Sequence, residues 1–408
     1  MPLTTFRPEV HGFLFENNFR NAIALGIETK GRCGGMAYLA LDYFNSRIPV
    51  PTHEPQDFGT EDEVPPDGSV LASLIFARLL DTFADNVDPW ASVYGPALVN
   101  DLVKATSNPS SGLGIVNWVV NPVGQVAAWL AGKIVDVATR SILEVTKDAI
   151  PILRRHLSEG KPMPLALIHN DSITDSGKSH QVVAYDSTLS GTLAEILVYD
   201  NNHPGSPVTL TTDFLRPDVI TYSTGETWAG FFVEENYSPK MPPYLDLAIA
   251  NPGITAQKDG PVRESWKRLV RPGKIRSFVK VATQLHEASN PLRIDCKVRN
   301  FGEFNAHYAV IRVVVDGPVP SATVLQGDGD ETLSPGQELS LSHTIPSFST
   351  PGFYTIRLHC DRKGSLPTAE LPVIGSPNRA ITVEVVPQGH VPRPAGPPPG
   401  KIDVDVDV

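Results

Sequence analysis

"GRCGGMAYLALDYF", residues 31–44, joins a cysteine to the start of an apolar run. Apolar residues then recur at helical spacing, which predicts a helix over residues 33–45. A thiolate at this helix start would be stabilised by the helix dipole and by free backbone N–H groups. Gly34 and Gly35 are expected to leave the space beside the sulfur open to a substrate carbonyl. Cys33 is therefore a candidate nucleophile, and the alternative is a small core cysteine.

A thiol nucleophile needs an imidazole partner that a third group orients. Most histidines of the chain fall in predicted loops, but His180 opens a predicted strand in "SGKSHQVVAYD". The next predicted strand, "AEILVYDNN", ends at Asp200, and an antiparallel pairing of the two strands would bring this carboxylate beside His180. Asp200 could then fix the imidazole, with Asn201 and Asn202 as alternative orienting residues.

This ordered set of motifs resembles the papain-like cysteine peptidases, and particularly the bacterial C39-like group. In that group a cysteine-bearing helix precedes an "H-x-V-V-x-Y" strand and a "Y-D-x-N" strand end, as "HQVVAYD" and "YDNN" do here. The resemblance covers about residues 1–240. It implies that Cys33 is the nucleophile, His180 the general base and acid, and Asp200 the orienting group.

The oxyanion hole departs from the family pattern. The family usually carries a glutamine six residues before the cysteine, and this chain has Ile27 at that position. The stretch "GFLFENNF" offers Asn17 or Asn18 as the side-chain amide donor, beside the backbone N–H of Cys33. Asn17 is the preferred candidate, and a loop or capping role is the alternative for both residues.

Transglutaminase-like enzymes share the order of cysteine, histidine and aspartate. "GRCGGMAYLALDYFNSRIPV" resembles their cysteine helix too, which would imply acyl transfer to an amine. Their histidine usually precedes a tryptophan, and "SHQVVAYD" does not follow that pattern. The transferase interpretation therefore ranks second.

Helices come first and strands second in the region that carries these motifs. Helical patterns cover residues 69–84 and parts of residues 123–157. Short β-branched runs follow, namely "PLALIHN", "SHQVVAYDS", "AEILVYDNN" and "PVTLTTD". This order predicts an α+β domain over residues 1–240, which the resemblance specifies as a papain-like fold with a helical insert at about residues 65–157.

Residues 244–386 are predicted to contain strands only. Seven short strands separated by turn signals predict a β-sandwich, and the region resembles a CARDB-type immunoglobulin-like adhesion module. Alternation places Cys296 and Cys360 on the core side of their strands, as reduced core thiols or as a disulfide. Residues 387–408 are rich in proline and then acidic, which predicts an extended, disordered tail.

The amino-acid composition and the N-terminal sequence indicate which partners and which cell compartment to expect. Of the 408 residues, 41% are hydrophobic, and 34 Lys and Arg against 45 Asp and Glu give a formal charge of −11. This acidic balance argues against nucleic acid as a partner. The N-terminal stretch has no basic region followed by an apolar one, which predicts no signal peptide and a cytoplasmic location, with unconventional export as the alternative. Residues 112–132 are expected to form buried helices rather than a membrane-touching hairpin.

The sequence as a whole predicts a thiol-dependent, cysteine peptidase-like hydrolase that cleaves a peptide or isopeptide bond through a Cys33 thioester. A catalytically inactive binding or adhesion protein is the alternative from another class. No cofactor and no metal are expected, because the chain has no CxxC, HExxH or phosphate-cradling glycine motif. The expected partners are a peptide or protein substrate and a protein or surface ligand of the β-sandwich.

Overall fold

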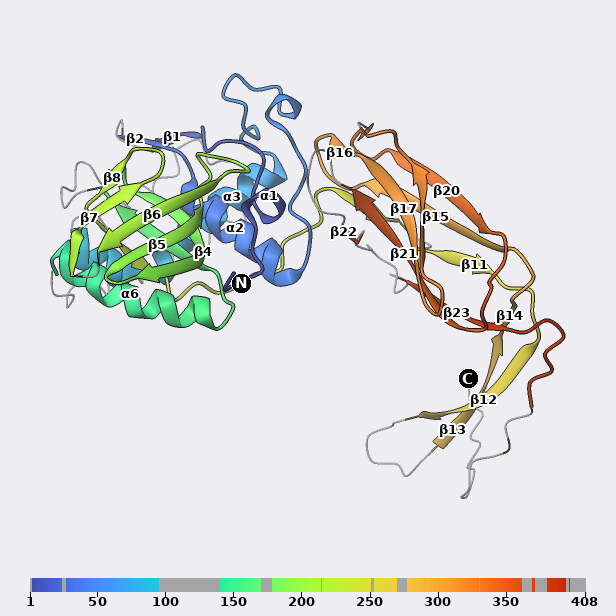
Figure 1. The fold of residues 1–408 in the computed structure, drawn as a ribbon. Helices are drawn as coiled ribbons and strands as arrows, with labels where there is room; N and C mark the ends of the chain where they lie inside the picture. The colour runs from blue at the N-terminus through green and yellow to red at the C-terminus, as the bar shows by residue number, and fades with distance from the viewer. Residues whose placement is uncertain are drawn as a thin grey trace. The chain divides into compact units, whose positions relative to one another are not determined.

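The computed structural model describes residues 2–23, 27–94, 140–169, 178–213, 215–250, 253–269, 277–329, 331–361, 369–370, 380–393 and 396. The chain divides into two compact units (Figure 1). The first unit comprises Met1–Asp246 with Gly302–Ala306, and the second comprises Leu247–Phe301 with His307–Val408. The candidate site lies in the first unit.

Helices with defined bounds all belong to the first unit. They are α1 (Pro8–His11), α2 (Cys33–Ser46), the 3-10 helix η1 (Pro55–Asp57), α3 (Val70–Asp85) and α6 (Ile142–Ser158), and residues 87–94 are helical as well. A serine caps each of the two long amphipathic helices: Ser69 accepts from the backbone of Ala72, and Ser141 forms a capping box with Glu144. The helices predicted at residues 33–45 and 69–84 are confirmed.

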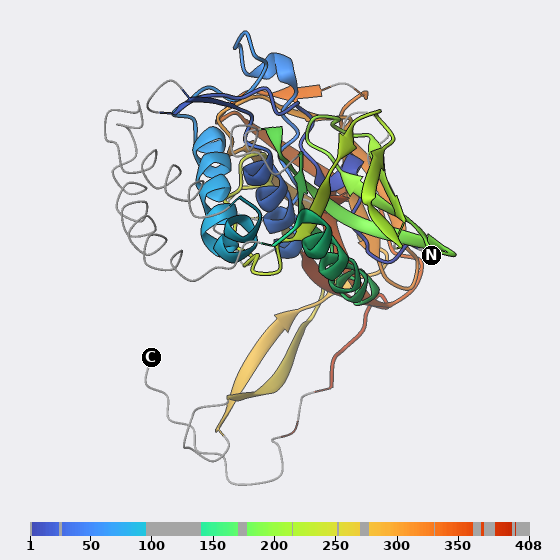
Figure 2. The same ribbon diagram turned by 90° about the vertical axis from the view of Figure 1, so that its left-hand side faces the viewer.

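The first unit is built around a seven-stranded antiparallel sheet with the strand order β8-β7-β6-β5-β4-β3-β9 (Figures 1 and 2). Its strands are β3 (Met163–Ile168), β4 (His180–Ser190), β5 (Leu193–Tyr199), β6 (Pro207–Asp213), β7 (Arg216–Tyr222), β8 (Thr227–Trp228) and β9 (Gly230–Val233). The sheet curls, so that β7 comes into contact with β9 although the two strands are not neighbours in this order. A separate ribbon pairs β1 (Arg20–Ile23) with β2 (Ile27–Lys30).

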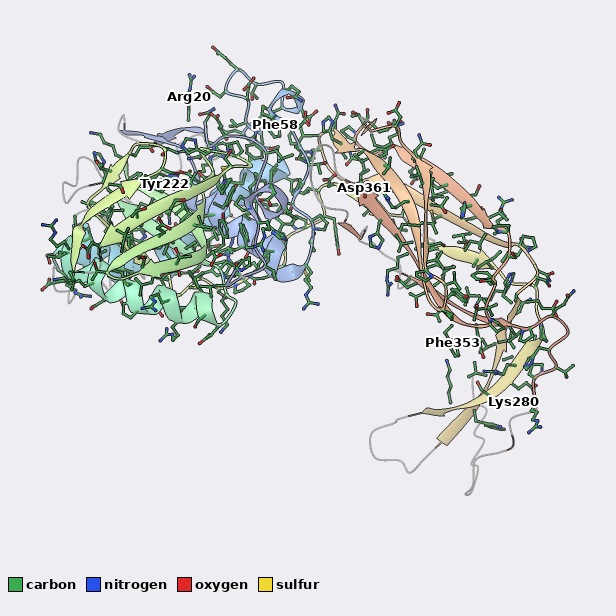
Figure 3. All side chains as sticks on the ribbon, in the orientation of Figure 1. Arg20, Phe58, Tyr222, Lys280, Phe353 and Asp361 are labelled. Carbon is green, nitrogen blue, oxygen red and sulfur yellow. The ribbon has the colours of Figure 1, made fainter. Side chains whose placement is uncertain are left out.

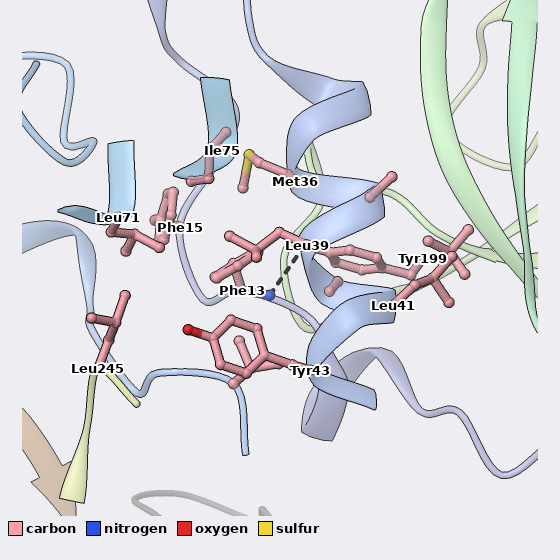
Figure 4. Packing of buried hydrophobic residues seen from close by; sticks show 14 of the residues in the cluster. Phe13, Phe15, Met36, Leu39, Leu41, Tyr43, Leu71, Ile75, Tyr199 and Leu245 are labelled. Carbon is pink, nitrogen blue, oxygen red and sulfur yellow. Dashed lines mark hydrogen bonds between the residues drawn. The ribbon is translucent and has the colours of Figure 1, made fainter. Parts of the chain in front are cut away.

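Helices cover both faces of this sheet. Val183 and Tyr185 of β4 belong to the apolar cluster around α2, whereas Val182 and Ala184 belong to the cluster around α6. Because alternate residues of a strand point to opposite faces, the first six residues of β4 are all buried. Figure 4 shows the α2 side of this core, where the phenol of Tyr199 accepts a hydrogen bond from the backbone N–H of Phe13. The start of β4, which carries His180, is thereby held rigidly.

Antiparallel sheets also form the second unit. The four-stranded sheet contains β10 (Leu247–Ile249), β11 (Thr255–Gln257), β15 (Leu292–Asn300) and β20 (Glu338–Ile345). The six-stranded sheet contains β14 (His286–Glu287), β17 (Val310–Asp316), β18 (Ser321–Gln326), β21 (Gly352–Asp361), β22 (Ala369–Glu370) and β23 (Ile381–Val386), with β14 parallel to β23. Two ribbons complete it: β12 (Val262–Leu269) with β13 (Ser277–Gln284), and β16 (Ala306–Tyr308) with β19 (Glu331–Leu333).

The predicted fold class is wrong. Neither an α+β papain-like fold with a helical insert nor a C-terminal immunoglobulin-like sandwich describes the chain, because strands hold about twice as many residues as helices and form large curled antiparallel sheets. Within the expected insert, α6 packs directly on the sheet as part of the first unit's core. The sequence patterns missed strands that lack a long apolar alternation, such as β9, "GFFV", and β12, "VRESWKRL".

The two cysteines of the second unit lie where the alternation placed them. Cys296 of β15 and Cys360 of β21 are both buried, and both are reduced thiols. Residues 112–132 and most of the tail at 387–408 lie outside the described residues. In the part of the chain that the structure describes, no helix has the length and apolar character needed to cross a membrane.

Candidate functional site

A buried histidine–aspartate pair forms the centre of the candidate site. Antiparallel pairing of β4 with β5 brings the first residue of β4, His180, beside Asp200, which directly follows β5. The Nε2 atom of His180 lies 2.7 Å from Oδ1 of Asp200, and the two residues are only 6% and 2% exposed. Asp200 also accepts hydrogen bonds from the hydroxyl of Tyr222 at 2.9 Å and from the backbone N–H of Asn202 at 2.8 Å.

The electrostatics of this pair favour its charged form. Burial alone would lower the pKa of His180, but the Asp200 carboxylate and the neighbouring Cys33 outweigh it and raise that pKa to about 10. Burial alone would raise the pKa of Asp200, but the His180 charge and three hydrogen bonds hold it below its usual value. These interactions favour the protonated imidazole, which the Asp200 carboxylate holds in place.

Cys33 is the first residue of α2 and is partly exposed. Its side chain interacts with the His180 ring, both as a hydrogen-bond partner and by charge, which contributes to the raised pKa of His180. Because Asp200 occupies Nε2, the ring nitrogen left for the thiol is Nδ1. The structure thus brings together Cys33, His180 and Asp200, the three residues that sequence reasoning selected.

Asn201 and Asn202, the alternative orienting residues, contact the residues next to the imidazole. The amide of Asn201 donates to the backbone oxygen of Cys33 at 3.0 Å and to that of Gln181 at 3.2 Å, so it connects α2 to β4. Asn202 acts on Asp200 through its backbone N–H. Of the three residues, Asp200 is therefore the one whose side chain contacts the imidazole.

The two oxyanion candidates lie in different surroundings. Oδ1 of Asn17 accepts a hydrogen bond from the backbone N–H of Arg32, the residue before Cys33. Its amide group packs against Gly31, where the backbone has a φ of +87° and a Cβ atom would overlap the amide nitrogen. Asn18 is exposed and donates to Glu16 instead. Asn17 is therefore held against the backbone of Gly31 and Arg32, directly before Cys33.

The two glycines after Cys33 do not leave open space, contrary to the sequence interpretation. A Cβ atom at Gly34 would overlap the side-chain oxygen of Gln181, and one at Gly35 would overlap the backbone oxygen of Ile75 in α3. The space that a side chain would need at these two positions is therefore occupied by Gln181 of β4 and by the backbone of Ile75 in α3. The glycines allow β4 and α3 to approach the first turn of α2 closely.

Four residues around the triad were missed by sequence reasoning. Tyr222 of β7 (Figure 3) supports Asp200, and the indole of Trp228 stacks on the His180 ring with centroids 6.1 Å apart and planes 18° apart. Gln181 and Glu234 form a buried hydrogen bond behind Gly34. Gln181 could have been predicted from the sequence, because it is a polar residue directly after the candidate histidine. Tyr222, Trp228 and Glu234 could not, because they lie in or directly after strands that the sequence patterns did not predict. Within the described residues, no group of three or more His, Cys, Asp or Glu residues could hold a metal ion.

Comparison with known proteins identifies no relative of this chain. No family matches it, and no curated protein does. Among solved structures it is similar to the alkylpurine DNA glycosylase AlkC of Pseudomonas fluorescens bound to DNA containing an abasic site analog, at 10% identity and a TM-score of 0.17 over 22% of this chain and 27% of that chain. A β-glucosidase from Listeria innocua in complex with glucose gives 11% identity and a TM-score of 0.17 over 30% of this chain and 16% of that chain. The chain spans less than a third of either protein, and such TM-scores carry no functional argument.

Proposed function

We propose that the protein is a thiol-dependent hydrolase that cleaves a peptide or isopeptide bond with Cys33 as the nucleophile. One observation carries this proposal: a cysteine at a helix N-terminus interacts with an imidazole whose far nitrogen is held 2.7 Å from a buried aspartate. This is the constellation of nucleophile, base and orienting group that activates a thiol. Such a triad is recognised by its geometry and recurs on unrelated folds, so the absence of a papain-like fold does not weigh against it.

The acylation step uses the imidazolium–thiolate form of the pair. The Cys33 thiolate attacks the substrate carbonyl carbon, and the carbonyl electron pair moves to oxygen. The backbone N–H of Cys33, which has no partner within its own helix because it lies in the first turn, and the amide N–H of Asn17 would bind this oxyanion. When the carbonyl reforms, the C–N bond breaks, and His180 gives its proton to the departing amine, leaving a thioester.

Deacylation reverses the role of His180. Acylation removes the negative charge on the sulfur and the proton on the imidazole, so the ring is now neutral and can accept a proton from water. The water oxygen forms a bond to the thioester carbon, and the C–S bond breaks to release the acid and the Cys33 thiolate. Asp200 stabilises each imidazolium that forms, through the bond to Nε2.

The test measures alkylation of the thiol and bond cleavage in the same variants. Iodoacetamide at neutral pH should label Cys33 quickly, and His180→Ala should slow both the labelling and the cleavage of a fluorescence-quenched peptide library by about 10²–10⁴-fold. His203→Ala is the control, because His203 contacts Asp200 only through its backbone N–H. If Cys33 labels no faster than a free thiol in a denatured chain, and His180→Ala changes nothing, the hydrolase proposal is wrong and a binding protein remains.

Acyl transfer is separated from hydrolysis by adding a fluorescent primary amine to the same reaction. Incorporation of the amine into a protein substrate that depends on Cys33 would identify a transglutaminase-like enzyme. Release of free acid with no incorporated amine would support the hydrolase.

A further inference from the structure

Glu234 is a buried carboxyl group beside the candidate site. It directly follows β9 and is 0% exposed. Its Oε1 accepts a hydrogen bond from Nε2 of Gln181 at 2.5 Å, whereas its Oε2 has no hydrogen-bond partner among the described residues. The triad mechanism makes no use of this side chain, and a buried, half-satisfied carboxyl group is costly to keep.

Gln181 connects this carboxyl group to the nucleophile. Its side-chain oxygen lies against Gly34, close enough that a Cβ atom there would overlap it. Its backbone oxygen accepts from the amide of Asn201, and that same amide donates to the backbone oxygen of Cys33. Glu234 and Gln181 therefore form a buried hydrogen-bonded pair that packs against the first turn of α2.

The surroundings of Glu234 favour its uncharged form. Burial raises the pKa of this carboxyl group well above its usual value, and the charges of Cys33 and Asp85 act in the same direction. The hydrogen bond from Gln181 and the nearby indole of Trp90 oppose the shift without reversing it. An ionised Glu234 would place a second buried anion near the Cys33 thiolate, so the neutral form is the one compatible with a charged nucleophile.

We propose that Glu234 is a positioning residue of the candidate site, which holds Gln181 against Gly34 and thereby fixes the first turn of α2 and the Cys33 sulfur. This inference rests on the proposed function, because positioning matters only if Cys33 reacts. The carboxyl group acts here as a neutral hydrogen-bond acceptor. A glutamine side chain can accept the same bond, so the amide isostere should replace it.

The first experiment compares the rate of Cys33 alkylation from pH 5 to 9 in the wild type, Glu234→Gln and Glu234→Ala. Glu234→Gln should keep the wild-type rate and pH profile, and Glu234→Ala should slow labelling by about tenfold or more, because small displacements of a reacting group are costly. Glu235→Gln is the matched control, since Glu235 is an exposed neighbour paired with Arg155. A wild-type rate in Glu234→Ala overturns the proposal, and so does a profile of Glu234→Gln shifted to lower pH, which would show that Glu234 carries a charge in the native protein.

The second experiment is independent of catalysis and of the stability of the alanine variant. A protonated carboxyl group has an infrared carbonyl band at higher frequency than a carboxylate. At neutral pH the wild type should show such a band, and Glu234→Gln should lack it. If the two spectra coincide, Glu234 is not neutral and the proposal fails even when Cys33 is reactive. If the band is present but Cys33 is unreactive, Glu234 is neutral as proposed, and it is the proposed function that fails, together with the positioning role that rests on it.

Discussion

Cys33 in the first unit and Cys296 in the second unit place the same side chain in two different environments. Cys296 lies in the middle of β15, where burial raises the pKa of its thiol to about 12 and the backbone N–H groups are used by the sheet. Cys33 lies at the first residue of α2, beside an imidazole and free first-turn N–H groups. A strand interior offers a thiol neither a base nor unpaired donors. We therefore expect the reactivity of a thiol in this protein to depend on its position in the helix or strand and on the partner that another element supplies.

The expected difference in reactivity between Cys33 and Cys296 is tested most directly by labelling both thiols in one native sample. At pH 8 a thiol with a pKa of about 12 is ionised in only about one molecule in 10⁴, so Cys33 should be modified on the order of 10³–10⁴-fold faster than Cys296. Mass spectrometry of peptides after timed exposure to iodoacetamide gives both rates. Comparable rates would remove the distinction between the two environments.

The orienting role of Asp200 is tested by Asp200→Asn. The amide keeps the shape but cannot stabilise an imidazolium, so the rate of peptide cleavage should fall by about 10³–10⁴-fold. Asn202→Ala serves as the control, because Asn202 contacts Asp200 only through its backbone. A larger loss in Asn202→Ala than in Asp200→Asn would move the orienting role to the neighbouring residue.

Asn17 and Asn18 provide a matched pair for the oxyanion hole. Asn17→Ala should lower kcat by about 10²–10³-fold, the usual cost of one oxyanion donor, while leaving the alkylation of Cys33 almost unchanged. Asn18→Ala should leave both unchanged, because its side chain contacts only Glu16. Equal effects of the two substitutions on kcat would contradict the assignment of Asn17.

Gly34→Ala tests whether the glycine serves packing. The added methyl group would overlap Gln181, so the free energy of unfolding should fall by about 1–3 kcal/mol. Gly396→Ala is the control, since nothing lies near a Cβ atom at that position. Urea unfolding measures both variants. An unchanged stability in Gly34→Ala would restore the original interpretation, in which the glycine leaves open space.

The smallest expected effect is a pH dependence of stability. His180 has a folded pKa of about 10, above the unfolded value of about 6.5. Its stabilising contribution is therefore complete below pH 6.5 and is lost as the pH rises toward 10. The comparison of Cys33→Ala with Cys33→Ala/His180→Ala removes the thiol titration and measures the part of the contribution that depends on Asp200 rather than on Cys33. A stability difference that grows between pH 6.5 and 10 would reverse the assigned direction.

Local patterns predicted the local elements of the site. The helical spacing after Cys33 and the β-branched run after His180 correctly predicted α2 and β4. The fold class was wrong because short or charged strands such as β9 and β12 carry no apolar alternation. These strands form because of the strands to which they are hydrogen-bonded, and the residue pattern within one strand does not contain that information.

Spacing over a few residues was enough to predict that a cysteine begins a helix, that a histidine begins a strand and that an aspartate lies at the end of the next strand, which it directly follows. The contacts of Tyr222 with Asp200 and of Trp228 with His180 became known only from the tertiary structure. The same is true of Gln181, which fills the space beside Gly34, and of the buried Glu234, which accepts a hydrogen bond from Gln181. Those contacts join segments that are far apart along the chain. Their formation depends on how the curled sheet closes around α2, which no local pattern encodes.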